Sequence, residues 1–126
     1  MTLGQLSNIK ILVVDDSRDN RVLLEIILKA EGAVLDFAEN GNEAFEKASK
    51  HEYDIILLDI QLPGLDGFEV LTKLKSEYYN KPIIALTAHA MLEEKHKALD
   101  AGFTDHVTKP IDRSVLIKSI LLHLKN

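Results

Sequence analysis

The chain contains no cysteine, which excludes disulfide bonds, thiolate zinc sites, iron–sulfur clusters and cysteine nucleophiles. It also has no long apolar segment, because its hydrophobic runs end after about four residues, whereas a membrane-spanning helix needs about 20. The N-terminus shows no basic segment followed by an apolar run, so a signal peptide is not indicated. We therefore expect a cytoplasmic protein with no membrane partner.

A surplus of positive charge is absent as well. The chain has 15 Lys and Arg residues against 20 Asp and Glu residues, for a formal net charge of -5 at pH 7. This balance argues against a nucleic-acid partner. Hydrophobic residues make up 46% of the chain and charged residues 28%, which is typical of globular proteins. With 126 residues, we expect a single domain over 1–126, with its core at about 9–124.

Short apolar, β-branched segments alternate along the chain with segments of helical periodicity. The predicted strands are residues 9–14, 33–38, 54–58, 83–86 and 104–108. The predicted helices are residues 18–31, about 40–51, about 67–78, 90–101 and a last helix capped by Asp112. A regular βα alternation requires right-handed crossovers and parallel strands. The sequence therefore predicts an α/β fold: a (βα)5 doubly wound, five-stranded parallel sheet in a flavodoxin-like three-layer sandwich.

Polar residues stand at the carboxyl ends of the predicted strands, where open parallel sheets bind their ligands. Asp15 and Asp16 follow the first strand, Asp59 the third, Thr87 the fourth and Lys109 the fifth. Any one of them alone would be an ordinary helix cap or solvated loop residue. All five at one edge of the sheet indicate a functional site.

The chemistry of this cluster follows from its residue types. Three carboxylates at close range repel one another, which raises their pKa values or recruits a cation. Hard oxygen ligands without His or Cys favour Mg²⁺. A carboxylate beside Mg²⁺ can act as a nucleophile toward phosphorus, while Thr87 and Lys109 hold the other phosphoryl oxygens. The cluster therefore predicts phosphoryl transfer to a carboxylate.

The segments that carry these residues resemble the signature blocks of response-regulator receiver domains. They are 13–17 (Val-Val-Asp-Asp-Ser), 54–67, 82–88 and the pair Lys109-Pro110, in this order. Residues 85–91 are most similar to receivers attached to hybrid sensor kinases. The resemblance implies a two-component or phosphorelay module that takes a phosphoryl group from phosphohistidine. It implies no enzyme activity beyond self-catalysed acceptance and autodephosphorylation.

The resemblance also implies a role for each matching residue. Asp59 would accept the phosphoryl group, and Lys109 and Thr87 would contact it. Mg²⁺ would be bound by Asp15, Asp16, Asp59 and the backbone carbonyl of Gln61. The Lys109–Pro110 peptide would be cis.

Two further features of the family concern signalling and lifetime. His106 stands where most receivers have the Tyr or Phe that rotates together with Thr87. A titratable ring there predicts weaker or pH-sensitive coupling between site and surface. Gln61 and His89 occupy the positions that flank the attacking water, so they would tune the lifetime of the phosphorylated form.

Surplus apolar residues indicate two partner surfaces. Val22 and Ile26 lie beside the expected core stripe of the first helix, which contains Leu23. They are either the margin of a wide core face or a docking surface for a sensor histidine kinase or a histidine phosphotransfer protein. The second surface, for a second copy or an unknown output protein, comprises Ile111, Val115 and Leu122.

Three other functions compete with a receiver. A flavodoxin-like electron carrier would need a Ser/Thr-rich phosphate loop after the first strand, where this chain has Asp15-Asp16-Ser17. A haloacid dehalogenase-type phosphatase would need an Asp two residues after its nucleophile, where Gln61 stands. A pseudo-receiver that binds partners without phosphorylation remains the main alternative. The start at Met1 and the lack of a linker favour a stand-alone regulator over a piece of a hybrid kinase.

Overall fold

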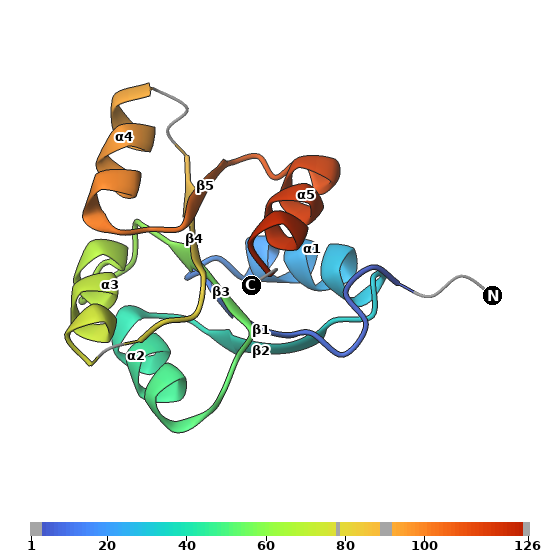
Figure 1. Ribbon diagram of the computed structural model, residues 1–126, viewed down its shortest axis with the longest axis horizontal. Helices are drawn as coiled ribbons and strands as arrows, with labels where there is room; N and C mark the ends of the chain where they lie inside the picture. Colours follow the sequence, from blue (N-terminus) through green and yellow to red (C-terminus); the bar gives the residue numbers. More distant parts are fainter. Residues whose placement is uncertain (1–3, 78, 89–91, 125–126) are drawn as a thin grey trace.

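The computed structural model describes residues 4–77, 79–88 and 92–124, with the side chains of 92–94 left out. Strands and helices alternate strictly along this part of the chain (Figure 1). The strands are β1 (Lys10–Val14), β2 (Val34–Ala38), β3 (Ile55–Asp59), β4 (Ile83–Thr87) and β5 (Asp105–Thr108). The helices are α1 (Arg18–Lys29), α2 (Gly41–Lys50), α3 (Gly67–Ser76), α4 (Leu92–Ala101) and α5 (Arg113–Leu124).

The strands form one parallel sheet in the order β2-β1-β3-β4-β5. Helices α1 and α5 cover one face, and α2, α3 and α4 cover the other (Figure 1). The predicted (βα)5 doubly wound sandwich is therefore confirmed. The strand order reverses between β1 and β3, which is where such sheets bind ligands.

Burial on both faces explains why the central strands are apolar along their whole length. Successive side chains of a strand point to opposite faces, so Leu12 and Val14 pack under α2 and α3 while Ile11 and Val13 pack under α1 and α5. Every residue of β3 and β4 is buried. This two-sided burial fits continuous runs such as residues 55–58 and would not fit an alternating polar pattern.

Side-chain caps set where several helices begin. Ser17 accepts a hydrogen bond from the Asn20 backbone N–H and caps α1. Asp66 and Glu69 form a capping box at the start of α3. Asp112 accepts from the backbone N–H groups of Ser114 and Val115, which confirms it as the cap of α5. These local signals fix the loops that carry the polar residues of the sheet edge.

The helix ends differ slightly from the prediction. α1 ends at Lys29 rather than at residue 31, because the chain turns sharply there, with Gly32 at φ +89°. Leu23, expected in the core stripe, is 40% exposed, so the buried face of α1 is narrower than predicted. In the opposite direction, β3 and β4 extend one residue further, to include Asp59 and Thr87.

The N-terminal segment contributes packing that the periodicity does not reveal. Leu6 is fully buried in the layer under α1 and α5. The Gln5 backbone N–H donates 3.0 Å to the buried carboxylate of Glu31, which also pairs with Arg113 of α5. Glu31, just after α1, therefore links the N-terminal segment to the start of α5.

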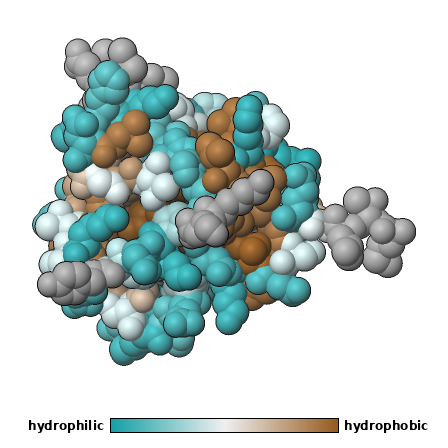
Figure 2. All heavy atoms as spheres, in the orientation of Figure 1, coloured by the Kyte–Doolittle hydropathy of each residue, from teal (hydrophilic) through white to brown (hydrophobic). Residues whose placement is uncertain are grey.

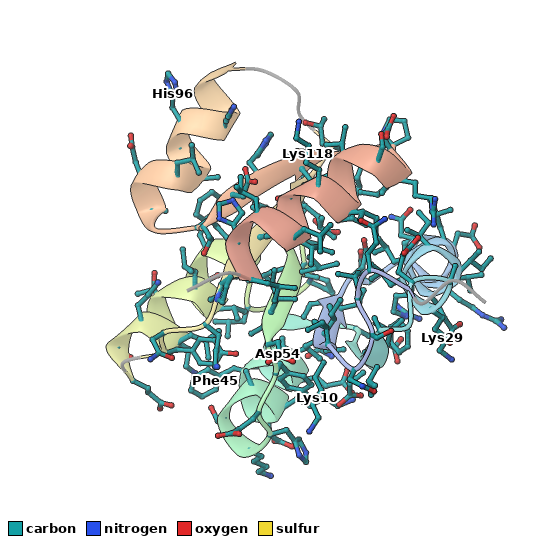
Figure 3. The ribbon with its side chains drawn as sticks, turned by 45° about the vertical axis from the view of Figure 1, so that its right-hand side comes forward. Lys10, Lys29, Phe45, Asp54, His96 and Lys118 are labelled. Carbon is teal, nitrogen blue, oxygen red and sulfur yellow. The ribbon has the colours of Figure 1, made fainter. Side chains whose placement is uncertain are left out.

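Three further features concern the surface, the amino end of the sheet and the helix lengths. Apolar side chains reach the surface on the α5 side in Figure 2. At the amino end of the sheet, the Lys10 backbone N–H donates 2.8 Å to Asp54, and both residues are labelled in Figure 3. Within the described part of the chain, no helix combines the length and hydropathy needed to cross a bilayer.

Candidate functional site

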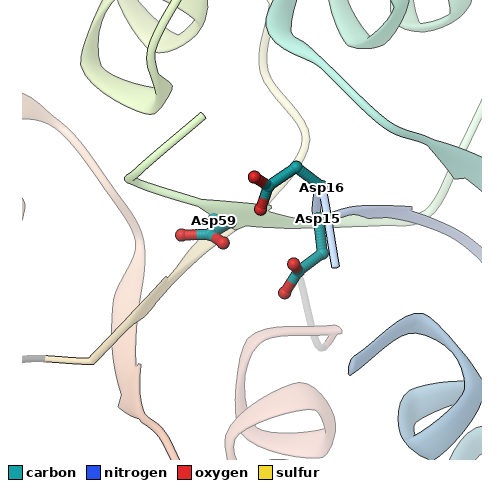
Figure 4. Close-up of side chains that lie close together, drawn as sticks. All are labelled: Asp15, Asp16 and Asp59. Carbon is teal, nitrogen blue, oxygen red and sulfur yellow. The ribbon is translucent and has the colours of Figure 1, made fainter. Parts of the chain in front are cut away.

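The five predicted site residues come together at the carboxyl edge of the sheet. Asp59 and Thr87 are the last residues of β3 and β4, and Asp15 directly follows β1. Figure 4 shows the side chains of Asp15, Asp16 and Asp59 converging from two neighbouring strands. Asp15 and Asp59 are buried, whereas Asp16 is exposed. The acidic cluster is therefore half enclosed and open to solvent on the Asp16 side.

Lys109 bridges the two buried carboxylates. Its Nζ lies 2.8 Å from Asp59 Oδ2 and 2.9 Å from Asp15 Oδ2. The lysine reaches them from the loop after β5, 50 residues from Asp59 along the chain. One ammonium thus offsets part of the charge of three carboxylates.

Backbone N–H groups hold the other oxygen of each buried carboxylate. The Ser17 N–H donates 2.9 Å to Asp15 Oδ1, and the Gln61 N–H donates 2.9 Å to Asp59 Oδ1. Each donor lies two residues after its acceptor, so each loop bends back as soon as its strand ends. The side chains are therefore held in place by the turns that follow the strands.

Burial sets the protonation behaviour of the cluster. Burial raises the pKa of Asp59 above its ordinary value, and the negative charge of Asp15 adds to this, although Lys109 and the Gln61 N–H oppose it. Burial lowers the pKa of Lys109, but its hydrogen bond to Asp59 and its ion pair with Asp15 outweigh burial and raise the pKa overall. The lysine therefore stays charged, and Asp59 is more basic than a free carboxylate.

The donor set fits a hard divalent cation. Asp15, Asp16 and Asp59 each offer a carboxylate oxygen, and these oxygens all lie within 4.8 Å of one another. An all-oxygen set with an exposed member suits Mg²⁺, which binds through a few carboxylates and keeps several waters. A cation there would also offset the effect of burial, and the smaller effect of the Asp15 charge, on the pKa of Asp59.

Comparison with known proteins decides the family. The family model of the response regulator receiver domain matches residues 11–121. The chain belongs to this family. The module is thus a receiver domain of two-component signalling, as the resemblance of its signature blocks implied.

Its relatives carry receivers in several settings. The chain is 40% identical over 117 residues to the transcriptional regulatory protein ResD of Bacillus subtilis, covering 92% of this chain and 48% of ResD. It is 36% identical to the sensor histidine kinase GacS of Pseudomonas protegens, covering 89% of this chain and 13% of GacS. The chain thus spans about half or less of these two relatives.

A solved structure has the same fold and a metal at its site. The receiver domain of sensor histidine kinase PA1611 from Pseudomonas aeruginosa superposes with a TM-score of 0.86 at 31% identity. The match covers 94% of this chain and 98% of that one. That structure is described with a magnesium ion coordinated in its active-site cleft. In the present chain, the cluster of Asp15, Asp16 and Asp59 supplies the carboxylate oxygens that such an ion needs.

The structure places the remaining predicted site residues as follows. The Lys109–Pro110 peptide is cis, as predicted. Thr87 is buried, and its carbonyl accepts from the Lys109 backbone N–H at 2.7 Å. His106 is half-buried on β5, beside Ala85 of β4. His89 lies outside the described residues.

The two predicted partner surfaces are exposed to different extents. Val22, Ile26, Val115 and Leu122 are all exposed, with Ile26 and Leu122 near 65%. Ile111 is different, because it is half-buried and packs against the core layer under α1 and α5. Ile111 therefore offers less surface to a partner than Val115 and Leu122 do, because the chain between β5 and α5 folds back onto the core.

Sequence reasoning missed the contacts of four polar residues that support the site and β5. Arg21 donates from α1 to the backbone carbonyl of Asp15. Asp105 accepts one hydrogen bond from the Ser119 hydroxyl and contacts His123 Nε2 at 3.0 Å, which ties α5 to the strand that carries His106. Spacing within one element gives no signal for such contacts, because each joins two elements.

The Asp105 contacts make stability depend on pH. Burial raises the pKa of Asp105, but hydrogen bonds from Ser119, the His106 N–H and His123 outweigh it and lower the pKa below 3.8. A carboxylate with a lowered folded-state pKa stabilises the protein above 3.8, and this contribution is lost as the pH falls through the folded-state pKa. We expect Asp105→Asn to lose about 1 kcal/mol of unfolding free energy at pH 7 and a smaller amount at pH 3, measured by urea unfolding. Asp100→Asn, an exposed change on α4, is the control; an equal loss at both pH values would contradict the prediction.

Proposed function

We propose that this receiver accepts a phosphoryl group on Asp59 from a phosphohistidine donor in a Mg²⁺-dependent reaction. The observation that carries the proposal is the bridge from Lys109 to both buried carboxylates, beside an exposed third carboxylate. If Lys109 only formed a structural ion pair with Asp15 and Asp59, a third carboxylate, that of Asp16, would not be needed at the same edge of the sheet. Residues 1–126 would form one domain, with self-catalysed phosphoryl acceptance and autodephosphorylation as its only chemistry.

In the proposed reaction, a carboxylate oxygen of Asp59 attacks the phosphorus of the donor. A carboxylate O–P bond forms, the P–N bond of phosphohistidine breaks, and its electron pair stays on the imidazole nitrogen. Lys109 would move from Asp59 Oδ2 to a phosphoryl oxygen, and Thr87 would donate its hydroxyl to another.

A metal ion would be held by Asp15, Asp16 and Asp59, with the Gln61 carbonyl as the further ligand. When bound, Mg²⁺ neutralises charge on the carboxylates and on the phosphoryl oxygens. The chain itself would position the nucleophile, since the Gln61 N–H fixes the orientation of the Asp59 carboxylate. Gln61 and His89 would then set how long the phosphoryl group lasts.

The donor would be a sensor histidine kinase or a histidine phosphotransfer protein. Val22 and Ile26 form an exposed apolar strip on α1, the helix that follows the Asp15 loop, and such a strip suits a helical donor. Val115 and Leu122 on α5 would serve an output protein or a second copy. Thr87 and His106 would link phosphorylation to that surface.

Intact-protein mass spectrometry after incubation with acetyl phosphate tests the proposal. We expect one added phosphoryl group in the presence of Mg²⁺, none with EDTA and none on Asp59→Asn. Titration with beryllofluoride and Mg²⁺, followed by calorimetry, covers a receiver that uses acetyl phosphate poorly. No mass gain and no heat would favour the pseudo-receiver, which binds partners without phosphorylation.

A further inference from the structure

Arg21 has an unusual place beside the acidic cluster. Its side chain is only 16% exposed, although it belongs to a surface helix. Its Nη1 donates 2.7 Å to the backbone carbonyl oxygen of Asp15, and its Nη2 lies 3.6 Å from the carboxylate of Glu39. The guanidinium thus joins α1, the end of β1 and the residue after β2.

The carbonyl that Arg21 binds belongs to the peptide group between Asp15 and Asp16. The other polar groups of Asp15 are held as well, because its N–H donates 3.1 Å to the Ala38 carbonyl and its Oδ1 accepts from Ser17. These contacts hold the Asp15 residue on both sides of its Cα, and the Arg21 hydrogen bond restricts rotation of the Asp15–Asp16 peptide group. Asp16 is attached to that group, and its side chain is exposed, so the direction in which it points depends on the peptide group more than on packing.

We propose that Arg21 is a positioning residue for the metal site, which holds the Asp15–Asp16 peptide so that both carboxylates face the same cation. This inference rests on the proposed function, because it assumes that the acidic cluster binds Mg²⁺. Arginine suits the task better than lysine, since its planar guanidinium can bind the carbonyl and Glu39 at the same time.

The charge of Arg21 and its positioning role predict opposite changes in Mg²⁺ affinity when Arg21 is replaced. A guanidinium near the cluster repels a second cation, so by charge alone its removal would tighten Mg²⁺ binding. If Arg21 orients the ligands, its removal weakens binding instead. Residues that orient metal ligands change metal affinity by about 10- to 100-fold when replaced. We therefore expect the dissociation constant of Mg²⁺ to rise about 10-fold in Arg21→Gln.

A matched control lies on the same helix. Arg18 is exposed at the first position of α1, so Arg18→Gln removes the same charge without removing a contact to Asp15. Calorimetric titration of Mg²⁺ into the full chain should give Arg18→Gln an affinity equal to or above that of the unchanged protein. Arg21→Lys keeps the charge and one donor, so its affinity should fall between that of Arg21→Gln and that of the unchanged protein.

The rate of phosphorylation by acetyl phosphate gives a second readout. At saturating Mg²⁺, Arg21→Gln should reach the same maximal rate as the unchanged protein. It should need about 10-fold more Mg²⁺ to reach half of that maximal rate. Unchanged or tighter Mg²⁺ binding in Arg21→Gln, or a lowered maximal rate, would overturn the inference alone. If Arg21→Gln fails to fold by circular dichroism, Arg21→Lys decides by the same measurement. Absence of Mg²⁺ binding in the unchanged protein would overturn the proposed function first, and the inference with it.

Discussion

Replacing Lys109 by alanine is expected to slow phosphoryl acceptance about 100-fold at saturating Mg²⁺, since a single charged donor to a developing oxyanion contributes that much in other enzymes. The lysine is the only cation within ion-pair distance of Asp59 among the residues that the structure describes. In the proposed reaction it transfers its contact from the carboxylate to the phosphoryl group. The rate would be followed by mass spectrometry with acetyl phosphate.

Binding of Mg²⁺ should change in the opposite direction. Lys109 Nζ lies 2.9 Å from Asp15 and 2.8 Å from Asp59, so its removal leaves the two carboxylates without this counter-charge. The binding of a divalent cation between them is then favoured more strongly. Lys109→Ala should therefore bind Mg²⁺ more tightly while it reacts more slowly. A change that merely disturbed the fold would weaken both.

Lys118 supplies the control for this experiment. It is exposed on α5, where Figure 3 labels it, and its replacement by alanine removes one lysine without touching the acidic cluster. Lys118→Ala should leave the rate and the Mg²⁺ affinity unchanged. A rate for Lys109→Ala within about threefold of the unchanged protein would contradict the role given to Lys109.

The second large effect concerns Gly67, the first residue of α3. A β-carbon at this position would lie 2.6 Å from Ile60 Cα and 2.7 Å from the Asp59 carbonyl oxygen. Both are backbone atoms, so no side-chain rotation can relieve the contact. The Gly67 N–H also donates 2.9 Å to the Ile60 carbonyl, which holds the loop against the end of β3.

We expect Gly67→Ala to cost about 3 kcal/mol of unfolding free energy, at the upper end of ordinary overpacking. In a solvent-exposed helix, Gly→Ala would raise the free energy of unfolding by about 1 kcal/mol. The sign of the measured change therefore tests whether the backbone contact is present. Because Asp59 itself must shift, phosphoryl acceptance should fall as well. Urea unfolding and the acetyl phosphate assay measure the two effects.

Gly64 in the same loop gives the matched comparison. It has φ +71°, but a β-carbon added there would meet no heavy atom within 4 Å. Gly64→Ala therefore carries only the cost of a left-handed backbone, about 1 kcal/mol. A Gly67→Ala variant no less stable than Gly64→Ala would show that the loop yields easily, contrary to the expectation.

The sequence alone determined the order of the elements and the residues at the sheet edge. Continuous runs such as residues 55–58 report burial on two faces, and polar residues at their ends must then share one edge of a parallel sheet. The acidic pattern of Asp15, Asp16 and Asp59 predicted a cation site for the same reason. These inferences need only local periodicity and one topological rule.

Only the tertiary structure decided which side chains meet. The bridge from Lys109 to Asp15 and Asp59, the contact of Arg21 with the Asp15 carbonyl and the pairing of Glu31 with Arg113 each join separate elements. Such contacts depend on strand register, on helix rotation and on how each loop turns. A polar residue on an amphipathic helix has the same sequence pattern whether it faces water or a neighbouring backbone. For the same reason, the exposure of Leu23 and the packing of Ile111 against the core depend on how the helices are placed on the sheet.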